Sequence, residues 1–297
     1  MHYLITGGTG LIGRELCRRL LSEGHQITLW TRDVKKAHQT CGEQVKAVTA
    51  LDMIPAHESF DAVINLAGEP IADGRWTTAQ KQKIEQSRIG LTRQLVDWLA
   101  QHPQKPHSLI SGSAVGWYGD QGDRLVTEQS DFHDEYSHQL CAQWEAAAET
   151  ARELGIRVAI VRTGLVVAAE GGFLSKMLLP FKLGLGGRIS HGRQYMPWIH
   201  LHDIARLFIF LSQHASAEGV FNGTAPTPVT NQQFTKTLAE ALKRPAIFPV
   251  PAVVLKVAFG EMSDLLLGGQ NAVPEKAQAI GFEFSYTDLL TTLNSVV

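Results

Sequence analysis

Residues 1–33 constrain the fold of this 297-residue chain more than any other stretch. His2–Thr6 is a short apolar run, and Gly7, Gly10 and Gly13 follow it at the spacing G-x-x-G-x-x-G. Apolar residues then recur at helical spacing before a second apolar run at 27–30. The order of strand, glycine turn, helix and strand predicts a βαβ unit at the start of the chain.

Glycines at these positions have a chemical purpose in such a unit. One makes a tight turn, one lets the backbone approach a pyrophosphate, and one allows the helix to pack closely on the strand. The helix N-terminus then offers free N–H groups and partial positive charge to the phosphates. The unit therefore predicts a dinucleotide-binding turn, and a glycine turn without a ligand is the alternative.

The residues after the second apolar run bear on which dinucleotide is bound. In NAD-binding proteins an acidic residue about 20 positions after the glycines accepts hydrogen bonds from the ribose. Here Thr31 and Arg32 occupy the strand end, with Lys35 and Lys36 nearby. Arginine cannot accept those bonds but can bind a 2′-phosphate, which favours NADP over NAD. Asp33 keeps NAD open, since a shift of one residue would restore an acidic group.

Composition excludes several classes of protein. Hydrophobic residues make up 44% and charged residues 19%, which is typical of a globular protein. A formal net charge of −2 gives no argument for nucleic-acid or membrane binding, and no apolar run reaches transmembrane length. The N-terminus is interpreted as the first strand rather than a removable signal. Cys17, Cys41 and Cys141 are widely spaced, which favours reduced thiols and a cytoplasmic protein.

Strands and helices are expected to alternate as far as residue 162. The further strands are predicted at 45–49, 60–68, 108–111 and 158–162, and the helices at 77–100 and 138–154. This alternation predicts an α/β protein with a Rossmann-type, doubly wound parallel sheet. After Gly164 the alternation of strands and helices stops, and the sequence becomes glycine-rich and apolar. This segment is expected to be mobile or to face the substrate. A late strand is expected at 219–223.

The predicted domains follow from that break. Residues 1–165, with 198–225 returning to them, are expected to form the NADP-binding domain, and 166–197 and 226–297 a smaller C-terminal, substrate-side subdomain. Helices are expected there after Thr230, at 251–267 and after Tyr286.

Several motifs now resemble those of one family, the extended or epimerase-like short-chain dehydrogenase/reductases. The order and spacing agree over nearly the whole chain for Gly7–Gly13, Asn65–Gly68, Ser111–Ala114, Tyr118–Asp120, Arg162–Gly164 and Trp198–Asp203. Residues 68–76, 87–89 and 260–284 are similar to an atypical branch with a small C-terminal domain of unknown function.

The resemblance implies which residues hold the cofactor. The predicted cofactor-binding residues, with the strand-end pair included, are Gly7, Thr9, Gly10, Leu11, Ile12, Gly13, Thr31, Arg32, Leu66, Ala67, Gly68 and Arg88. The family often dimerises through long helices, so helix 77–100 is the expected face of a homodimer. No metal is expected, because His200, His202 and Asp203 alone make a weak site.

The family's reaction passes a hydride between nicotinamide and substrate. A tyrosine acts as acid and base beside a lysine four residues later, and a serine holds the reacting oxygen. Ser113 matches that serine, and Tyr136 stands near the tyrosine's place, but Leu140 replaces the lysine. Without a nearby cation, a tyrosine keeps a pKa near 10 and is a poor base. Ser113 and Tyr136 are the predicted catalytic residues, with a capping serine and a surface tyrosine as their structural alternatives.

Two functions remain open. The first is an NADP-dependent oxidoreductase or epimerase acting on a small molecule, such as a carbonyl compound or a nucleotide sugar. The second is an NADP-binding sensor or scaffold that works through a protein partner. The missing tyrosine–lysine pair favours the second, whereas Ser113 and the aromatic, glycine-rich substrate side favour the first. Arg88 and Glu69 could bind a polar substrate or simply pair with each other.

Overall fold

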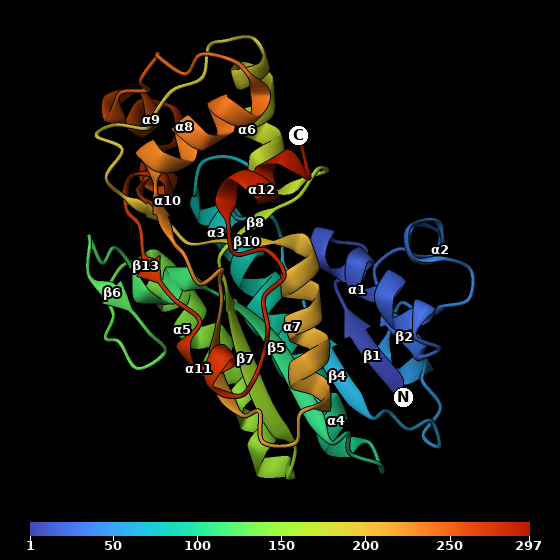
Figure 1. Cartoon of the computed structure of the whole chain (residues 1–297). Helices are drawn as coiled ribbons and strands as arrows, with labels where there is room; N and C mark the ends of the chain where they lie inside the picture. The colour runs from blue at the N-terminus through green and yellow to red at the C-terminus, as the bar shows by residue number, and fades with distance from the viewer.

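The computed structural model describes residues 1–297, and its centre is a seven-stranded sheet (Figure 1). All of its strand pairs are parallel, and the spatial order is β11-β7-β5-β4-β1-β2-β3. The strands are β1 His2–Thr6, β2 Gln26–Trp30, β3 Lys46–Val48, β4 Ala62–Asn65, β5 Ser108–Ala114, β7 Arg157–Thr163 and β11 Gly219–Gly223. This confirms the predicted doubly wound sheet, including the late strand that returns to its edge.

Helices cover both faces of the sheet, as a parallel sheet requires. On one face α1 (Leu11–Ser22) and α7 (Leu201–Gln213) bury their apolar sides on Tyr3 and Ile5 of β1. On the other face α4 (Leu91–Gln101) and α5 (Tyr136–Glu149) lie side by side, and Leu95 of α4 packs with Leu4 in a second core. The alternation of Tyr3, Leu4 and Ile5 between two cores follows from the two-residue period of a strand.

The helices differ from expectation in detail. The single helix predicted at 77–100 is divided into α3 (Thr78–Glu85), a π-helical turn at Gln86–Gly90, and α4. The π turn fits an extra residue into the helix and so changes which side chains face inward. The helix predicted at 138–154 starts earlier, at Tyr136, and ends in a 3₁₀ turn at Thr150–Leu154.

A second layer lies over the carboxyl ends of the strands, where α6, α8, α9 and α12 gather (Figure 1). The glycine-rich segment predicted to be mobile or to face the substrate contains a helix, α6. The helix predicted at 251–267 is divided into α9, a 3₁₀ turn and α10. The bounds are α6 Gly172–Lys182, α8 Asn231–Leu242, α9 Ala252–Phe259, α10 Asp264–Leu267, α11 Glu275–Ala279 and α12 Leu289–Asn294.

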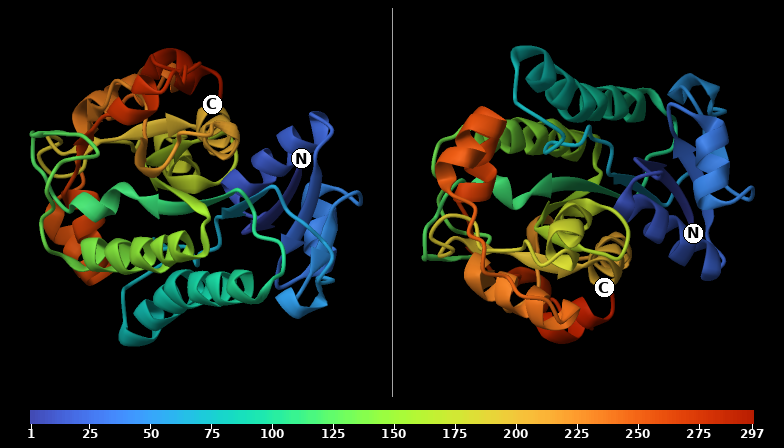
Figure 2. Two further views of the ribbon diagram at one scale, coloured as in Figure 1. Left: turned by 90° about the horizontal axis from the view of Figure 1, so that it is seen from below. Right: turned by 90° about the horizontal axis from the view of Figure 1, so that it is seen from above.

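Short strand pairs join this layer to the sheet. The pairs are β8 Leu165–Val167 with β10 Trp198–His200, β9 Tyr195–Met196 with β12 Val229–Thr230, and β6 Leu125–Val126 with β13 Asn271–Ala272. The subdomain has its own apolar core around Trp198, Phe234 and Leu293. Views along the sheet show this subdomain beside the central layer (Figure 2).

The C-terminal segment is tied to the sheet domain through Asp203 of α7. This buried carboxylate accepts hydrogen bonds from the backbone N–H groups of Ser285 at 3.1 Å and Tyr286 at 2.8 Å. Its other partner is Arg206, at 3.2 Å. Among the helices, none combines the length and the apolarity needed to cross a bilayer.

Candidate functional site

The glycine turn between β1 and α1 is packed too tightly for side chains. Gly7 has a φ of +70°, and a Cβ there would lie 2.6 Å from the backbone of Leu66 at the end of β4. A Cβ at Gly13 would lie 2.3 Å from the carbonyl oxygen of Gly7. These approaches are shorter than any real Cβ contact, so the predicted spacing brings the turn, α1 and the end of β4 together.

The N-terminus of α1 has donors without protein partners. Gly10 caps the helix and offers no side chain, and the first helical bond runs from Arg14 N–H to the Gly10 carbonyl at 3.0 Å. The backbone N–H groups of Leu11, Ile12 and Gly13 therefore lack intrahelical acceptors. Together with the helix dipole, they are suited to an anion such as a pyrophosphate.

A buried hydrogen-bond network holds the end of β4 against this turn. The Thr6 hydroxyl donates to Asn65 Oδ1 at 2.7 Å and accepts from the backbone N–H groups of Leu66 and Ala67, each at 3.1 Å. Asn65 in turn donates to the Thr92 hydroxyl at 2.8 Å. The predicted cofactor residues Leu66, Ala67 and Gly68 are thus held in a defined position at the carboxyl edge of the sheet.

The residues at the end of β2, which bear on the choice between NAD and NADP, make different contacts. The Asp33 carboxylate caps α2 (Val34–Cys41) by accepting from Lys36 N–H at 3.0 Å. Arg32 is 96% exposed at its side chain, and its nearest carboxylate is Glu69, 3.9 Å away. Asp33, the acidic residue that could have accepted hydrogen bonds from a ribose, therefore caps α2 instead. The exposed Arg32 side chain can turn toward a phosphate.

Arg88 lies on the π turn, beside the end of β4. A Cβ at Gly68 would lie 3.0 Å from the guanidinium carbon of Arg88, so the two residues are in direct contact. Arg88 also stacks over the Trp144 ring, 5.4 Å from its centre. Burial lowers the pKa of Arg88. The structure does not contain the alternative ion pair between Arg88 and Glu69, because the Glu69 carboxylate lies within ion-pair distance of Arg32 instead.

Ser113, the first predicted catalytic residue, is buried at the carboxyl end of β5. Its hydroxyl donates to Glu145 of α5 at 2.6 Å. Arg162 of β7 holds both oxygens of the same carboxylate, at 2.9 and 2.8 Å, and stacks 3.4 Å from the centre of the Trp117 ring. Arg162 begins one of the family motifs, but neither it nor Glu145 was predicted as a site residue. The sheet register pairs Ser113 with Arg162, and the packing of α5 brings Glu145 to both.

Tyr136, the second predicted catalytic residue, opens α5 and faces α3. Its hydroxyl donates to Glu85 at 3.3 Å, and the Lys81 ammonium lies 4.0 Å from the centre of its ring. Burial, and then the Glu85 carboxylate, raise the pKa of Tyr136 above its ordinary value. The lysine contacts the ring face and leaves the phenolic oxygen beside an anion, so this hydroxyl stays protonated and is a weaker acid than that of a free tyrosine.

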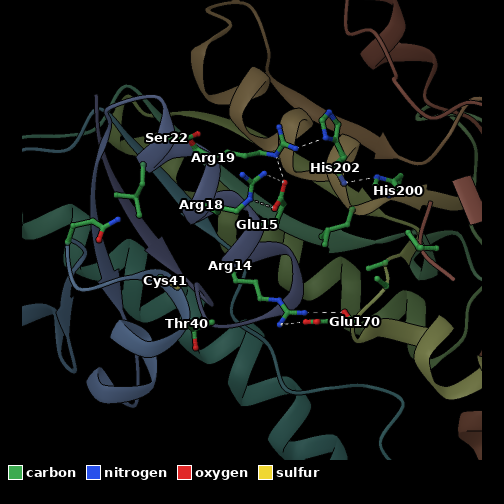
Figure 3. Close-up of a pocket in the computed structure, with 16 residues that line it drawn as sticks. Arg14, Glu15, Arg18, Arg19, Ser22, Thr40, Cys41, Glu170, His200 and His202 are labelled. Carbon is green, nitrogen blue, oxygen red and sulfur yellow. Dashed lines mark hydrogen bonds and ion pairs between the residues drawn. The ribbon is translucent and has the colours of Figure 1, made fainter. Parts of the chain in front are cut away.

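A groove of about 810 Å³ runs along the outer side of α1 (Figure 3). None of the predicted site residues line it. Its cations are matched by carboxylates, since Glu15 pairs with Arg18 and Arg19, and Glu170 lies 3.6 Å from Arg14. Each of the three arginines in the groove therefore lies within 4 Å of a carboxylate, and Glu15 serves two of them.

The two histidines in this groove lie where β10 passes into α7. His200 ends β10 and caps the helix, accepting from the backbone N–H of His202 at 3.0 Å. Burial lowers the pKa of His200 to about 4, so it is neutral at neutral pH. His202 is 2.5 Å from Arg19. Both rings thus have structural partners.

Comparison with known proteins places this geometry in a family. The model of the NAD dependent epimerase/dehydratase family matches residues 3–222, and that of a domain of unknown function (DUF1731) matches residues 250–296. The chain is 38% identical over 300 residues to the epimerase family protein YfhF of Bacillus subtilis, covering 100% of this chain and 98% of that protein.

Solved structures agree with both matches. The human epimerase family protein SDR39U1, crystallised with NADPH, superimposes with a TM-score of 0.89 at 33% identity, covering 100% of this chain and 99% of that one. UDP-glucose 4-epimerase of Thermotoga maritima shares the fold, with a TM-score of 0.80 at 17% identity and coverage of 100% and 97%. With the glycine turn, the parallel sheet and the family match extending over 3–222, this chain belongs to the NAD dependent epimerase/dehydratase family.

Proposed function

We propose that this protein binds NADP(H) along the carboxyl edge of the sheet. The pyrophosphate would lie at the N-terminus of α1, and Arg32 with Thr31 would bind the 2′-phosphate. One observation carries the choice of NADP over NAD: Asp33 is engaged as the cap of α2, while the guanidinium of Arg32 is exposed. The NADPH named for human SDR39U1 supports the same choice.

The reaction we propose is hydride transfer between NADP(H) and a small molecule, either a carbonyl compound or a nucleotide sugar. Support comes from the second layer of helices, which lies over the same edge as the cofactor site (Figure 1). Tyr136 is a poor proton acceptor there because its hydroxyl already faces Glu85. The Ser113 hydroxyl at the end of β5 donates to the carboxylate of Glu145 on α5, and we assign the proton transfer to this pair.

A second candidate function is an NADP-binding sensor or scaffold with little turnover. The bond from Ser113 to Glu145 favours it, because a hydroxyl committed to a buried carboxylate is less available to a substrate. Consumption of NADPH with a carbonyl compound, or epimerisation of a UDP-sugar in the presence of NADP, supports the enzyme. Binding of NADPH with neither reaction, across the whole panel, supports the sensor.

The NADP proposal is tested by titrating the protein with NADPH and NADH and following nicotinamide fluorescence. We expect NADPH to bind at least tenfold more tightly than NADH. Arg32→Glu should remove that preference, because a carboxylate repels the 2′-phosphate and accepts bonds from a ribose hydroxyl. Lys35→Glu, an exposed change nearby on α2, is the control and should have a smaller effect. Equal affinity of the wild type for both dinucleotides would overturn the proposal.

A further inference from the structure

Exposed apolar side chains gather at one end of the subdomain. Eight of the thirteen exposed large apolar residues of the chain lie in three of its segments: the end of α6 with the loop after it, the loop after α8, and α9. The exposed apolar side chains within residues 179–185, 247–248 and 253–257 are called the apolar patch. Single exposed apolar residues are ordinary, whereas a group of this kind marks an interaction surface.

Backbone hydrogen bonds hold the loops after α6 and α8 side by side. The N–H of Phe248 donates to the carbonyl of Gly186 at 3.2 Å. The N–H of Val250 donates to the carbonyl of Arg188 at 2.9 Å. The helix α9 begins directly after this second loop, at Ala252. The apolar patch is therefore one surface, and it lies at the end of the subdomain that is remote from the sheet (Figure 1, top).

The helix α9 is apolar on all sides and yet lies at the surface. Lys256 is the one polar residue in its sequence. Leu255 is its one buried residue, while the side chains of Val253 and Val257 are 64% and 68% exposed. A helix that is hydrophobic all round is normally buried. The rest of the chain leaves α9 uncovered, which indicates a partner outside the chain.

The cations around the apolar patch have no counter-charges. Residues 171–190 and 241–260 contain no Asp or Glu. Lys176 pairs with Asp73 from another part of the chain. The other cations of these two stretches are exposed and belong to no ion pair, and they are Lys182, Arg188, Lys243, Arg244 and Lys256. The net charge of −2 for the whole chain therefore conceals a local excess of positive charge.

We propose that the apolar patch and its cations bind the surface of an anionic lipid bilayer. Apolar side chains enter the boundary between head groups and acyl chains, while Lys and Arg side chains attract the anionic head groups. A second copy of the chain is a poorer occupant, because it would bring two sets of unpaired cations together. The side chains between the cations are almost entirely hydrocarbon, which suits a bilayer better than the hydrogen-bonded rim of a protein interface.

This inference is separate from the proposed function. None of the residues proposed to hold NADP(H) belongs to the apolar patch, so either proposal can fail without the other.

The test is co-sedimentation of the full chain with two kinds of vesicle: phosphatidylcholine alone, and phosphatidylcholine mixed equally with phosphatidylglycerol. Wild type is compared with two double variants. Val253→Asn with Val257→Asn makes one exposed side of α9 polar, since residues four apart share a helix face. Lys182→Gln with Lys256→Gln removes two of the unpaired cations.

Each double variant has a matched control outside the patch. Met53→Asn with Leu125→Asn replaces two exposed apolar residues of the sheet domain and β6. Lys35→Gln with Lys36→Gln removes two exposed cations of α2. All the altered side chains are exposed, so each variant should keep a Tm close to that of wild type, and thermal unfolding verifies that it is folded.

We expect wild type to bind the mixed vesicles about tenfold more tightly than phosphatidylcholine alone, because the cations add attraction to anionic lipid. Added NaCl should weaken this binding, since salt screens exposed charges. Both patch variants should bind the mixed vesicles about tenfold more weakly than wild type, while both controls stay close to it. The comparison of lipids and of salt needs no variant.

Several results would overturn the proposal. These are no binding of wild type to the mixed vesicles, equal binding to both kinds of vesicle, or equal losses in patch variants and controls. A wild-type dimer in sedimentation velocity that Val253→Asn with Val257→Asn dissociates, without vesicle binding, would assign the patch to a second copy. Retention of wild type by polyglutamate, again without vesicle binding, would assign it to an acidic protein surface.

Discussion

At the scale of single residues, the candidate catalytic positions are part of the protein's own polar interactions. Ser113 donates to Glu145, which Arg162 holds through both oxygens, and all three side chains are buried. Arg162 also packs on Trp117. The carboxylate held in this way orients the serine hydroxyl, so the cluster both stabilises the fold and sets the position of Ser113.

The cluster predicts an unequal response to two substitutions. Glu145→Gln breaks the bidentate pair and leaves the buried Arg162 charge uncompensated, which should lower the free energy of unfolding by about 3 kcal/mol. Ser113→Ala removes one hydrogen bond to a carboxylate that keeps its main partner, and should lower it by about 1 kcal/mol. Urea denaturation of both variants measures this. Equal losses of unfolding free energy in the two variants would show that the ion pair between Glu145 and Arg162 contributes no more to stability than the Ser113 hydrogen bond.

At the scale of elements, α1 and α7 show how their first turns differ in purpose. The first turn of α1 begins at Gly10 and leaves its N–H groups free. The first turn of α7 begins at His200, whose ring nitrogen accepts a hydrogen bond from the backbone N–H of His202. The same ring stacks on Tyr286, with 3.7 Å between the ring centres. The same backbone geometry therefore leaves free N–H donors at the start of one helix and satisfies one of them with a side chain at the start of the other.

His200 should make stability depend on pH. Its pKa in the folded protein is about 4, below the ordinary 6.5, so the unfolded chain takes up a proton first as the pH falls. The stabilisation is present above pH 6.5 and is lost progressively between pH 6.5 and 4. Between pH 7 and 5 the wild type should lose up to about 2 kcal/mol more than His200→Asn, which keeps a capping acceptor without titrating. Urea denaturation of both proteins at pH 7 and pH 5 measures these free energies of unfolding. Equal losses in wild type and His200→Asn would contradict the prediction.

At the scale of the whole molecule, the subdomain is a separate core laid over the cofactor edge. Leu289 and Leu293 of α12 pack with Phe234 and Leu238 of α8, while Asp203 ties the preceding segment to the sheet domain. The two parts are joined by short strands and by these polar contacts. A homodimer through α3 and α4 stays a prediction.

A cavity in the subdomain core should therefore lower stability without altering the cofactor site. Leu293→Ala removes a fully buried side chain and should cost about 3 kcal/mol of unfolding free energy. NADPH affinity should stay within twofold, since Leu293 is not among the residues of the glycine turn. Thr291→Ala, exposed on the same helix, is the matched control. Thermal unfolding and NADPH titration test both parts, and a large loss of affinity would show that the subdomain shapes the cofactor site.

The sequence by itself determined the βαβ start, the parallel sheet and the glycine turn, because these depend on local periodicity and on spacings within a few residues. Gly7, Gly10 and Gly13 form the turn between β1 and α1 where the pattern placed it, although the strand predicted at 60–68 is shorter and ends at Asn65. The missing lysine after Tyr136 was equally visible, since it needs only a count of residues along a helix.

Only the tertiary structure decided what the polar side chains do. It assigned Asp33 to a helix cap, Ser113 to Glu145 and Arg162, and Tyr136 to Glu85. It also placed the Arg88 guanidinium against Gly68. These outcomes depend on partners that are distant in sequence and on a π turn that shifts the phase of a helix, and no local pattern encodes either.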